Sequence, residues 1–362
     1  YNGFVLQIMI NQTYINMLEL NKAMDKKTIY DVAREAGVSI STVSRVINGS
    51  ANVRESTRRK VEAACVNYRP VASARDLPAK RSKMIGVLIN HRPEYFFLND
   101  TYSNALLGIS VAAKEAGYRL LLDICDTETE FDNLFYEQRV DGFVMMGVRK
   151  NSTLISLLKQ HEVPFVLVGS YHEDESVYQV DINDQSAIFS VTNYLIGLGH
   201  KRIGIITSSP EYTSASDRVE GYCQAMREAG LTVKNEWIQF CENLTEAKAE
   251  QLAKHMLYLP NRVSAIIAFN DSVAMAIYKA SKDCGLSIPR DLSVVGFDDT
   301  TLASYMSPPL TSVWQPSYEK GEKAMQMLIS QIEGRETSGR RVELNCLTMY
   351  RGSGAPCGED LQ

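Results

Sequence analysis

Short polar and basic side chains are concentrated in the run ISTVSR at residues 40–45. At helical spacing, Ile40, Ser41, Thr42, Ser44 and Arg45 share one outer face. Serine and threonine hydroxyls bond phosphate oxygens, and arginine can bond the N7 and O6 atoms of guanine with two N–H groups at once. These residue types predict contacts to the base edges and phosphates of a nucleic acid.

Two short amphipathic helices joined by a tight turn must carry this face. The first has apolar residues at helical spacing: Ile29, Val32, Ala33 and Ala36. Gly37 follows where a chain leaving a helix needs a positive φ, and Ser39 is placed to cap the second helix. The inner face of the second helix is Val43, Val46 and Ile47. The pattern is typical of a helix-turn-helix whose second helix enters the major groove.

The run TIYDVAREAGVSISTVSRVIN at residues 28–48, with a third helix opening at Glu55, resembles the DNA-binding head of the LacI/GalR family of bacterial transcription regulators. The resemblance implies DNA contacts at the matching positions: Thr28, Tyr30, Ser39, Ile40, Ser41, Thr42, Arg45 and Asn48. Of these, Ile40, Ser41 and Arg45 would face bases. Phosphates or sugars would be held by Thr28, Ser39, Thr42 and Asn48.

A hinge is expected at residues 70–83, because the segment from Val71 to Leu77 can form about two helical turns before Pro78 stops it. The resemblance implies that this hinge helix folds on the operator and that Leu77 wedges into the minor groove. Two departures count against it: the third helix is about two residues short for the family, and Val71 replaces the usual asparagine. A solvated linker, and a regulator that has lost operator binding, stay open as alternatives.

The charge of this 362-residue chain is divided between two regions, although the net charge is only −5. Residues 24–83 hold 13 Lys and Arg against 6 Asp and Glu, whereas residues 84–362 hold 24 against 36. A basic head that contacts phosphates and an acidic body that stays off DNA fit this division. Residues 1–25 show neither a signal peptide nor a membrane span, and we expect them to be an extension outside the native structure, with Met24 as the natural start.

The cysteines and the glycine patterns argue against cofactor or metal chemistry. The seven cysteines are scattered without a C-x-x-C pair, so a disulfide framework or metal site is not predicted, and a reducing cytoplasm is expected. No P-loop, G-x-G-x-x-G or G-x-S-x-G motif opens a βα unit. We therefore expect no cofactor and no enzymatic activity.

From Met84 onward, short apolar strands alternate with amphipathic helices, which is typical of doubly wound parallel sheets. Strands are predicted at 84–90, 118–125, 141–147, 164–170, 202–207, 264–270 and 292–298. The length fits two α/β lobes, and the pattern resembles the type I periplasmic-binding-protein fold. The predicted domains are an all-α helix-turn-helix head at 26–69, the hinge at 70–83, an effector-binding and dimerisation body at 84–352 and a tail at 353–362. Within the body, lobe one covers about 84–183 with a return at 316–345, and lobe two about 184–313.

Ligands of such folds bind outside the carboxyl ends of the strands, where the lobes face each other. The residues predicted there are Phe96, Phe97, Arg218, Asn270, Asp298 and Gln315. Aromatic rings would cover a sugar or base, while Asp298 and Arg218 suit vicinal hydroxyls. The alternatives are that Asp298 or Asp299 caps the next helix and that Arg218 forms a surface ion pair.

Tyr212 stands where purine-responsive relatives carry an arginine, which favours a sugar or glycoside as the effector. Because one head reads only a few base pairs, we expect a homodimer on palindromic double-stranded DNA, without a membrane partner. The predicted function is an effector-controlled transcriptional regulator, a repressor of carbohydrate uptake or catabolism genes. A sugar-binding protein of the periplasmic-binding type is the alternative, and it predicts an export signal.

Overall fold

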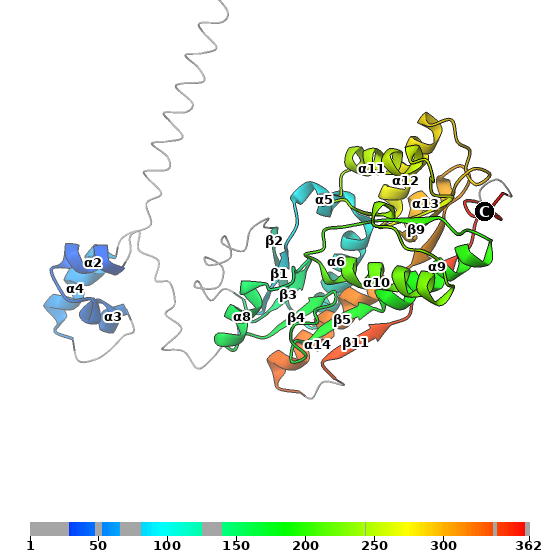
Figure 1. Cartoon of the computed structure of the whole chain (residues 1–362). Coiled ribbons are helices and arrows are strands. Elements are labelled where there is room, and N and C mark those ends of the chain that lie inside the picture. The colour runs from blue at the N-terminus through cyan, green and yellow to red at the C-terminus, as the bar shows by residue number, and fades with distance from the viewer. Residues whose placement is uncertain are drawn as a thin grey trace, which may run out of the picture. The chain divides into compact units, whose positions relative to one another are not determined.

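The structure is a computed structural model, and it describes residues 29–47, 53–65, 81–124, 140–242, 244–335 and 339–358. These residues belong to two compact units, a helical head that ends at residue 65 and an α/β body that begins at residue 81 (Figure 1). The head contains α2 (Ile29–Ala36), α3 (Ile40–Ile47) and α4 (Glu55–Ala64). Its core is Val32, Ala33, Ala36, Val43, Val46, Val61 and Ala64. The predicted inner faces of the first two helices are confirmed at these positions.

The first lobe of the body is a parallel sheet in the order β2-β1-β3-β4-β5-β11. Its strands are β1 (Met84–Ile89), β2 (Arg119–Ile124), β3 (Phe143–Met146), β4 (Phe165–Val168), β5 (Gln179–Ile182) and β11 (Arg341–Leu344). Its helices are α5 (Pro93–Leu98), α6 (Asp100–Glu115), α8 (Thr153–Gln160) and α14 (Ser317–Glu333). Alternate residues of β1, β3 and β4 enter two separate cores, so α8 lies on the opposite face of the sheet from α6 and α14.

The second lobe is a sheet in the order β7-β6-β8-β9-β10-β12, parallel except for β12. Its strands are β6 (Ile203–Thr207), β7 (Ile238–Phe240), β8 (Ala265–Ala268), β9 (Ser293–Asp298), β10 (Thr311–Trp314) and β12 (Leu347–Met349). Its helices are α9 (Asp184–Gly197), α10 (Thr213–Glu228), α11 (Glu246–Tyr258), α12 (Asp271–Asp283) and α13 (Thr301–Tyr305). All seven predicted strands are present, and no helix in the described ranges has the length and apolarity needed to cross a membrane.

The chain passes between the lobes after β5, after β10 and between β11 and β12. The first two passages lie where the sequence predicts the lobe boundaries. The third differs, because β12 and the segment that follows it pack on the second sheet, whereas the sequence analysis leaves a tail from residue 353. Ser353 is fully buried, and its carbonyl oxygen accepts the Val294 N–H at 2.9 Å.

Helix α14 follows the second passage and is fixed tightly to the first lobe. A Cβ atom at Gly321 would lie 1.9 Å from the Ala105 carbonyl oxygen on α6, so only glycine permits this approach of the two helices. The beginning of α14 is thereby held at a defined place between the lobes.

Candidate functional site

The turn between α2 and α3 has the predicted geometry. Gly37 adopts a φ of +65°, and the Val38 N–H donates to the Ala33 carbonyl at 3.0 Å. The Ser39 hydroxyl accepts the Thr42 N–H at 3.3 Å, which caps α3 as the sequence predicts. The turn and the cap therefore fix where α3 begins relative to α2.

The structure describes only part of the predicted DNA-contact set. Arg45 is exposed on α3, and the hydroxyls of Ser39 and Thr42 bond each other at 2.9 Å. Tyr30 belongs to α2, and Ile40 and Ser41 to α3. Three predicted positions, Thr28, Asn48 and Leu77, lie outside the described residues together with most of the hinge. The roles of all these residues at DNA stay predictions.

A cleft between the lobes of the body lies at the carboxyl ends of both sheets. Its volume of about 130 Å³ is enough for on the order of ten water molecules, which fits a small ligand. His91 and Gly147 follow β1 and β3, where the strand order of the first sheet reverses. Ser208 and Phe269 follow β6 and β8 at the corresponding point of the second sheet. In each lobe, the point where the strand order reverses therefore lies beside the same cavity, which is where α/β sheets bind ligands.

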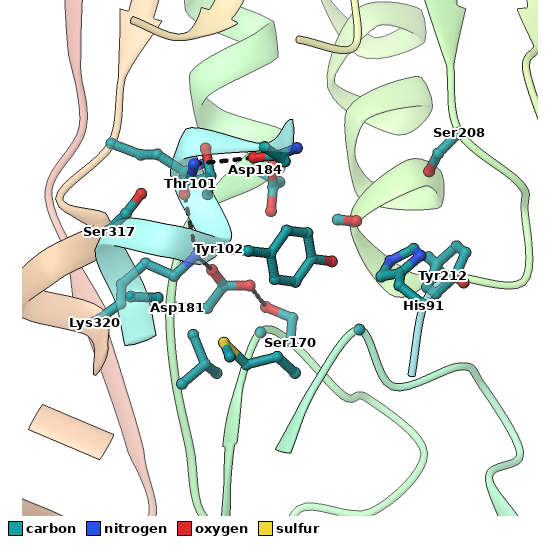
Figure 2. A pocket seen from close by; sticks show the side chains of 18 of the residues that line it. His91, Thr101, Tyr102, Ser170, Asp181, Asp184, Ser208, Tyr212, Ser317 and Lys320 are labelled. Carbon is teal, nitrogen blue, oxygen red and sulfur yellow. Dashed lines mark hydrogen bonds and ion pairs between the residues drawn. The ribbon is translucent and has the colours of Figure 1, made fainter. Parts of the chain in front are cut away.

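A chain of hydrogen bonds crosses the cleft from one lobe to the other (Figure 2). Ser170 donates to Asp181 at 2.9 Å, and Asp181 pairs with the Lys320 ammonium at 2.5 Å. Lys320 also donates to the Gln315 amide oxygen at 3.0 Å, and the Gln315 amide nitrogen donates to Asp298 at 2.5 Å. Gln315 and Asp298 therefore lie in the cleft, where the sequence predicts them.

Arg218 also lies in the cleft, in the second turn of α10. Its Nε donates to Asp184 at 2.6 Å, and one terminal nitrogen donates to the Phe269 carbonyl at 2.5 Å. The guanidinium carbon stands 3.5 Å from the centre of the Phe297 ring. With Arg218 only 5% exposed, the alternative of a surface ion pair is excluded.

Asp298 ends β9 with a φ of +95°, and Asp299 follows with a φ of +50°. Burial raises the pKa of Asp298, while Arg218 and the Gln315 amide oppose the shift. The helix that follows is α13, whose N-cap is Thr300. The Asp298 carboxylate therefore does not cap α13, and the capping alternative is excluded for this residue.

Tyr95, Tyr102, His91 and Tyr212 supply aromatic rings to the cleft; Phe96 and Phe97 do not line it. Residues 93–98 form the short helix α5, on which successive side chains differ in direction by roughly 100°. Phe96 is 1% exposed in the core of the first lobe, and Phe97 is 64% exposed. The sequence prediction for this pair is thus corrected, because α5 directs Phe96 into the core and leaves Phe97 exposed, while Tyr95 of the same helix lines the cleft.

The predicted residue Asn270 has a structural position at the edge of the site. Its amide oxygen accepts the Val273 N–H at 2.9 Å and caps α12, and its amide nitrogen lies 3.5 Å from the Tyr95 hydroxyl. Asn270 does not belong to the cleft lining. It connects to the cavity through Tyr95.

The mouth of the cleft is spanned by polar contacts between the lobes. The Lys150 N–H donates to the Glu211 carbonyl at 2.7 Å, and the Lys150 ammonium donates to the Ser216 hydroxyl at 2.5 Å. His172 bonds Asp217 at 2.9 Å. The ring of His91 stacks on Tyr212 with centroids 5.1 Å apart, and Figure 2 shows these two rings across the cavity from Asp181. These contacts join the two lobes directly.

The cleft offers hydrogen bonds and ring faces but little uncompensated charge. Asp184 is paired with Arg218, and Asp181 with Lys320. Burial, followed by Arg149 and Arg92, lowers the pKa of His91 to about 4, so this ring is neutral at pH 7. In the described ranges, no cluster of His, Cys, Asp or Glu is arranged to hold a metal ion. Such a cavity suits a neutral ligand with several hydroxyls.

Sequence reasoning missed Asp181, Asp184, Lys320 and Tyr102 as cleft residues. Asp181 and Asp184 lie at the end of β5 and the start of α9, and Lys320 lies in the first turn of α14. These three charged residues are next to a passage between the lobes, whereas Tyr102 lies in the first turn of α6. A search of the passages themselves, besides the strand ends, would have found the three charged residues.

Comparison with known proteins gives the same two parts of the chain. Residues 28–70 match the model of bacterial regulatory proteins of the lacI family, and residues 192–353 match a periplasmic binding protein-like domain. The HTH-type transcriptional repressor PurR of Photobacterium profundum is 35% identical over 90% of this chain and 98% of its own. Catabolite control protein A of Priestia megaterium is 33% identical over 90% and 98% of the two chains. Among solved structures, the transcriptional regulator CelR–cellobiose complex shows a TM-score of 0.72 at 29% identity and covers 91% of this chain and 100% of that one.

Proposed function

Because this chain belongs to the LacI family of bacterial regulatory proteins, we propose that it is a homodimeric repressor of carbohydrate uptake or catabolism genes, controlled by a sugar or glycoside in the cleft. It acts by binding in the cytoplasm, without cofactor or catalysis. Two heads bind the halves of a palindromic operator, because two-fold symmetry in the protein matches two-fold symmetry in the DNA.

A neutral effector is supported by one observation in particular: the charged side chains in the cleft walls are paired with one another. Arg218 and Lys320 each have a buried carboxylate partner, so neither cation is left for a phosphate or carboxylate ligand. Aromatic rings from Tyr95, Tyr102 and Tyr212 supply the apolar surface that a sugar ring requires. The cellobiose in the complex of the similar regulator CelR makes a neutral disaccharide the first compound to test.

Two alternatives are weighed against this proposal. A sugar-binding protein of the periplasmic-binding type would share the body, but the helix-turn-helix head has no purpose in it. A regulator that has lost operator binding would keep the effector response without any DNA preference. Selection of binding sites from random DNA separates this last case, since it would return no enriched palindrome.

The test of the cleft uses Asp298→Ala, with cellobiose and other neutral disaccharides as probes. A ligand moves a regulator only through its different affinity for two arrangements of the lobes. We expect Asp298→Ala to abolish disaccharide binding in calorimetry and the disaccharide effect on operator affinity, while operator affinity without sugar stays unchanged. Should Asp298→Ala bind the disaccharide as tightly as the unchanged protein, the cleft assignment fails.

A further inference from the structure

The carboxylate of Asp298 is presented by an unfavourable backbone conformation. Asp298 and Asp299 are consecutive non-glycine residues with φ values of +95° and +50°. L-residues adopt such values only at an energetic cost, so surrounding contacts must hold the turn between β9 and α13 in place. Those contacts come from two segments distant in sequence, α12 and the C-terminal segment.

Asp271, the first residue of α12, holds the backbone on the far side of the turn. Its Oδ2 accepts the Thr300 N–H at 2.6 Å and the Thr300 hydroxyl at 2.9 Å. Its Oδ1 accepts the Ser312 hydroxyl at 2.6 Å, and that hydroxyl oxygen in turn accepts the Asp299 N–H at 3.2 Å. Both amide groups that follow Asp298 are therefore tied, directly or through Ser312, to one carboxylate.

Strand β9 leaves room for the Asp271 carboxylate at Gly296. Asp271 is 1% exposed, and a Cβ atom at Gly296 on β9 would lie 2.5 Å from its Oδ1. Only glycine at position 296 lets the carboxylate pass beneath the strand. Asp271 is not part of the cleft lining, and its side-chain hydrogen bonds go to the turn and to Ser312.

Arg351 holds the same turn from the C-terminal segment. One terminal nitrogen donates to the Asp299 carboxylate at 2.5 Å and to the Leu310 carbonyl at 2.8 Å. The Arg351 N–H donates to the Thr311 hydroxyl at 2.9 Å. The turn is thus fixed between α12 on one side and a segment beyond β12 on the other.

We propose that Asp271 and Arg351 are positioning residues for the effector, which hold Asp298 in the cleft by fixing the left-handed pair at 298 and 299. The inference rests on the proposed function in one respect, namely that the Asp298 carboxylate binds the sugar. The C-terminal segment then supports the effector site through Arg351, although Arg351 does not line the cleft.

The first test compares Asp271→Asn with Asp283→Asn, a control at the other end of α12 whose side chain bonds Lys254 at the surface. Asparagine keeps the size of aspartate but removes one acceptor oxygen. We expect Asp271→Asn to speed hydrogen–deuterium exchange at residues 298–300 and to weaken cellobiose binding by about tenfold. Operator affinity without sugar should stay as in the unchanged protein, as should both readouts in the control. Faster exchange with unchanged cellobiose affinity would overturn the proposal.

The second test asks whether backbone conformation is the link. Glycine adopts a positive φ at little cost, and Arg351→Met already removes the side-chain partner of Asp299, so Arg351→Met combined with Asp299→Gly should recover several-fold of the cellobiose affinity that Arg351→Met loses. A role in general stability alone predicts no recovery. Arg351→Met should weaken cellobiose binding from the other side of the turn, and unchanged affinity would remove Arg351 from the proposal.

The hydrogen–deuterium exchange measurement needs no sugar. It therefore tests the positioning role of Asp271 independently of the proposed effector class. If the unchanged protein binds neither cellobiose nor other neutral disaccharides, the proposed effector class is wrong. Exchange at residues 298–300 then still decides the proposal: unchanged protection in Asp271→Asn would overturn it.

Discussion

The Lys320 ammonium lies 2.5 Å from the Asp181 carboxylate in the cleft, and each side chain is less than one-tenth exposed. Burial by itself would raise the pKa of Asp181, but the charge and hydrogen bond of Lys320 hold it below its ordinary value. Lys320 comes from α14 and Asp181 from β5, so the pair fixes the start of the return helix to the first sheet. A buried pair of this kind is costly to break from one side.

The first prediction concerns that pair. Lys320→Met leaves Asp181 buried without its cation and should lower the free energy of unfolding by about 3–5 kcal/mol in urea titrations. Lys320→Met with Asp181→Leu should recover most of this loss, because no buried charge remains. Lys323→Met is the control, since Lys323 is exposed on the same helix and lies 3.8 Å from Glu319. A loss in Lys320→Met no larger than in the control would contradict the prediction.

The second prediction concerns DNA recognition by α3. Arg45 is exposed and long enough for two hydrogen bonds to guanine, so Arg45→Ala should remove about 1–3 kcal/mol of discrimination at one base pair. Thr42→Ala should instead weaken binding to all sequences alike, because Thr42 is predicted to hold a phosphate, which carries no sequence information. Site selection from random DNA measures both. An identical preference for Arg45→Ala and the unchanged protein would show that α3 does not read bases through Arg45.

The third prediction is a dependence of stability on pH. Burial and the nearby Asp298 raise the pKa of Asp271 from 3.8 to about 7, so the folded protein holds this proton more tightly than the unfolded chain. The resulting stabilisation is fully present below pH 3.8 and is lost as the pH rises through about 7. Asp271→Asn cannot titrate, and its Tm should fall less than that of the unchanged protein between pH 4 and pH 7.

Asp184 and His91 also have shifted pKa values, so the Tm of Asp271→Asn must be compared with that of the unchanged protein at each pH. Burial raises the pKa of Asp184 to about 6, which acts in the same direction as Asp271. His91 acts in the opposite direction, because its lowered pKa favours the fold at higher pH. Both are present in the variant and the unchanged protein, so the difference between the two Tm curves reports Asp271 together with its charge interaction with Asp298. Parallel curves would contradict the raised pKa.

The fourth prediction concerns closure of the lobes. Lys150→Ala with His172→Ala removes two side-chain contacts across the mouth, to Ser216 and Asp217. The radius of gyration from X-ray scattering should increase, and disaccharide affinity should fall by about two- to thirtyfold, since two exposed pairs that contribute about 0.2–1 kcal/mol each amount to about 0.4–2 kcal/mol. Lys159→Ala, which breaks a pair with Asp174 within the first lobe, is the control. An unchanged radius would show that other contacts hold the lobes together.

The head and the alternation of the body follow from local sequence signals. Gly37, Ser39 and the helical spacing from Val32 to Val46 act within a few residues, so the turn, the cap and the inner faces could be predicted. The apolar strands could be predicted for the same reason, because strands buried on both faces read as continuous apolar runs. Asp298 was found because ligands of such folds bind at strand ends, whereas Gln315 was found in the passage between the lobes and Arg218 through the family resemblance.

The composition of the cleft was decided by tertiary structure. Five residues separate Phe96 from Tyr102, yet α5 buries Phe96 in the core, while Tyr95 of α5 and Tyr102 of α6 line the cavity. The partnership of Lys320 with Asp181, and of Arg351 with Asp299, joins positions far apart in the chain. Local periodicity carries no information about such pairs, since they depend on how the chain passes between the lobes. The sequence by itself determined which elements form and which sheet ends face a ligand, whereas only the packing of the lobes decided which charges meet there.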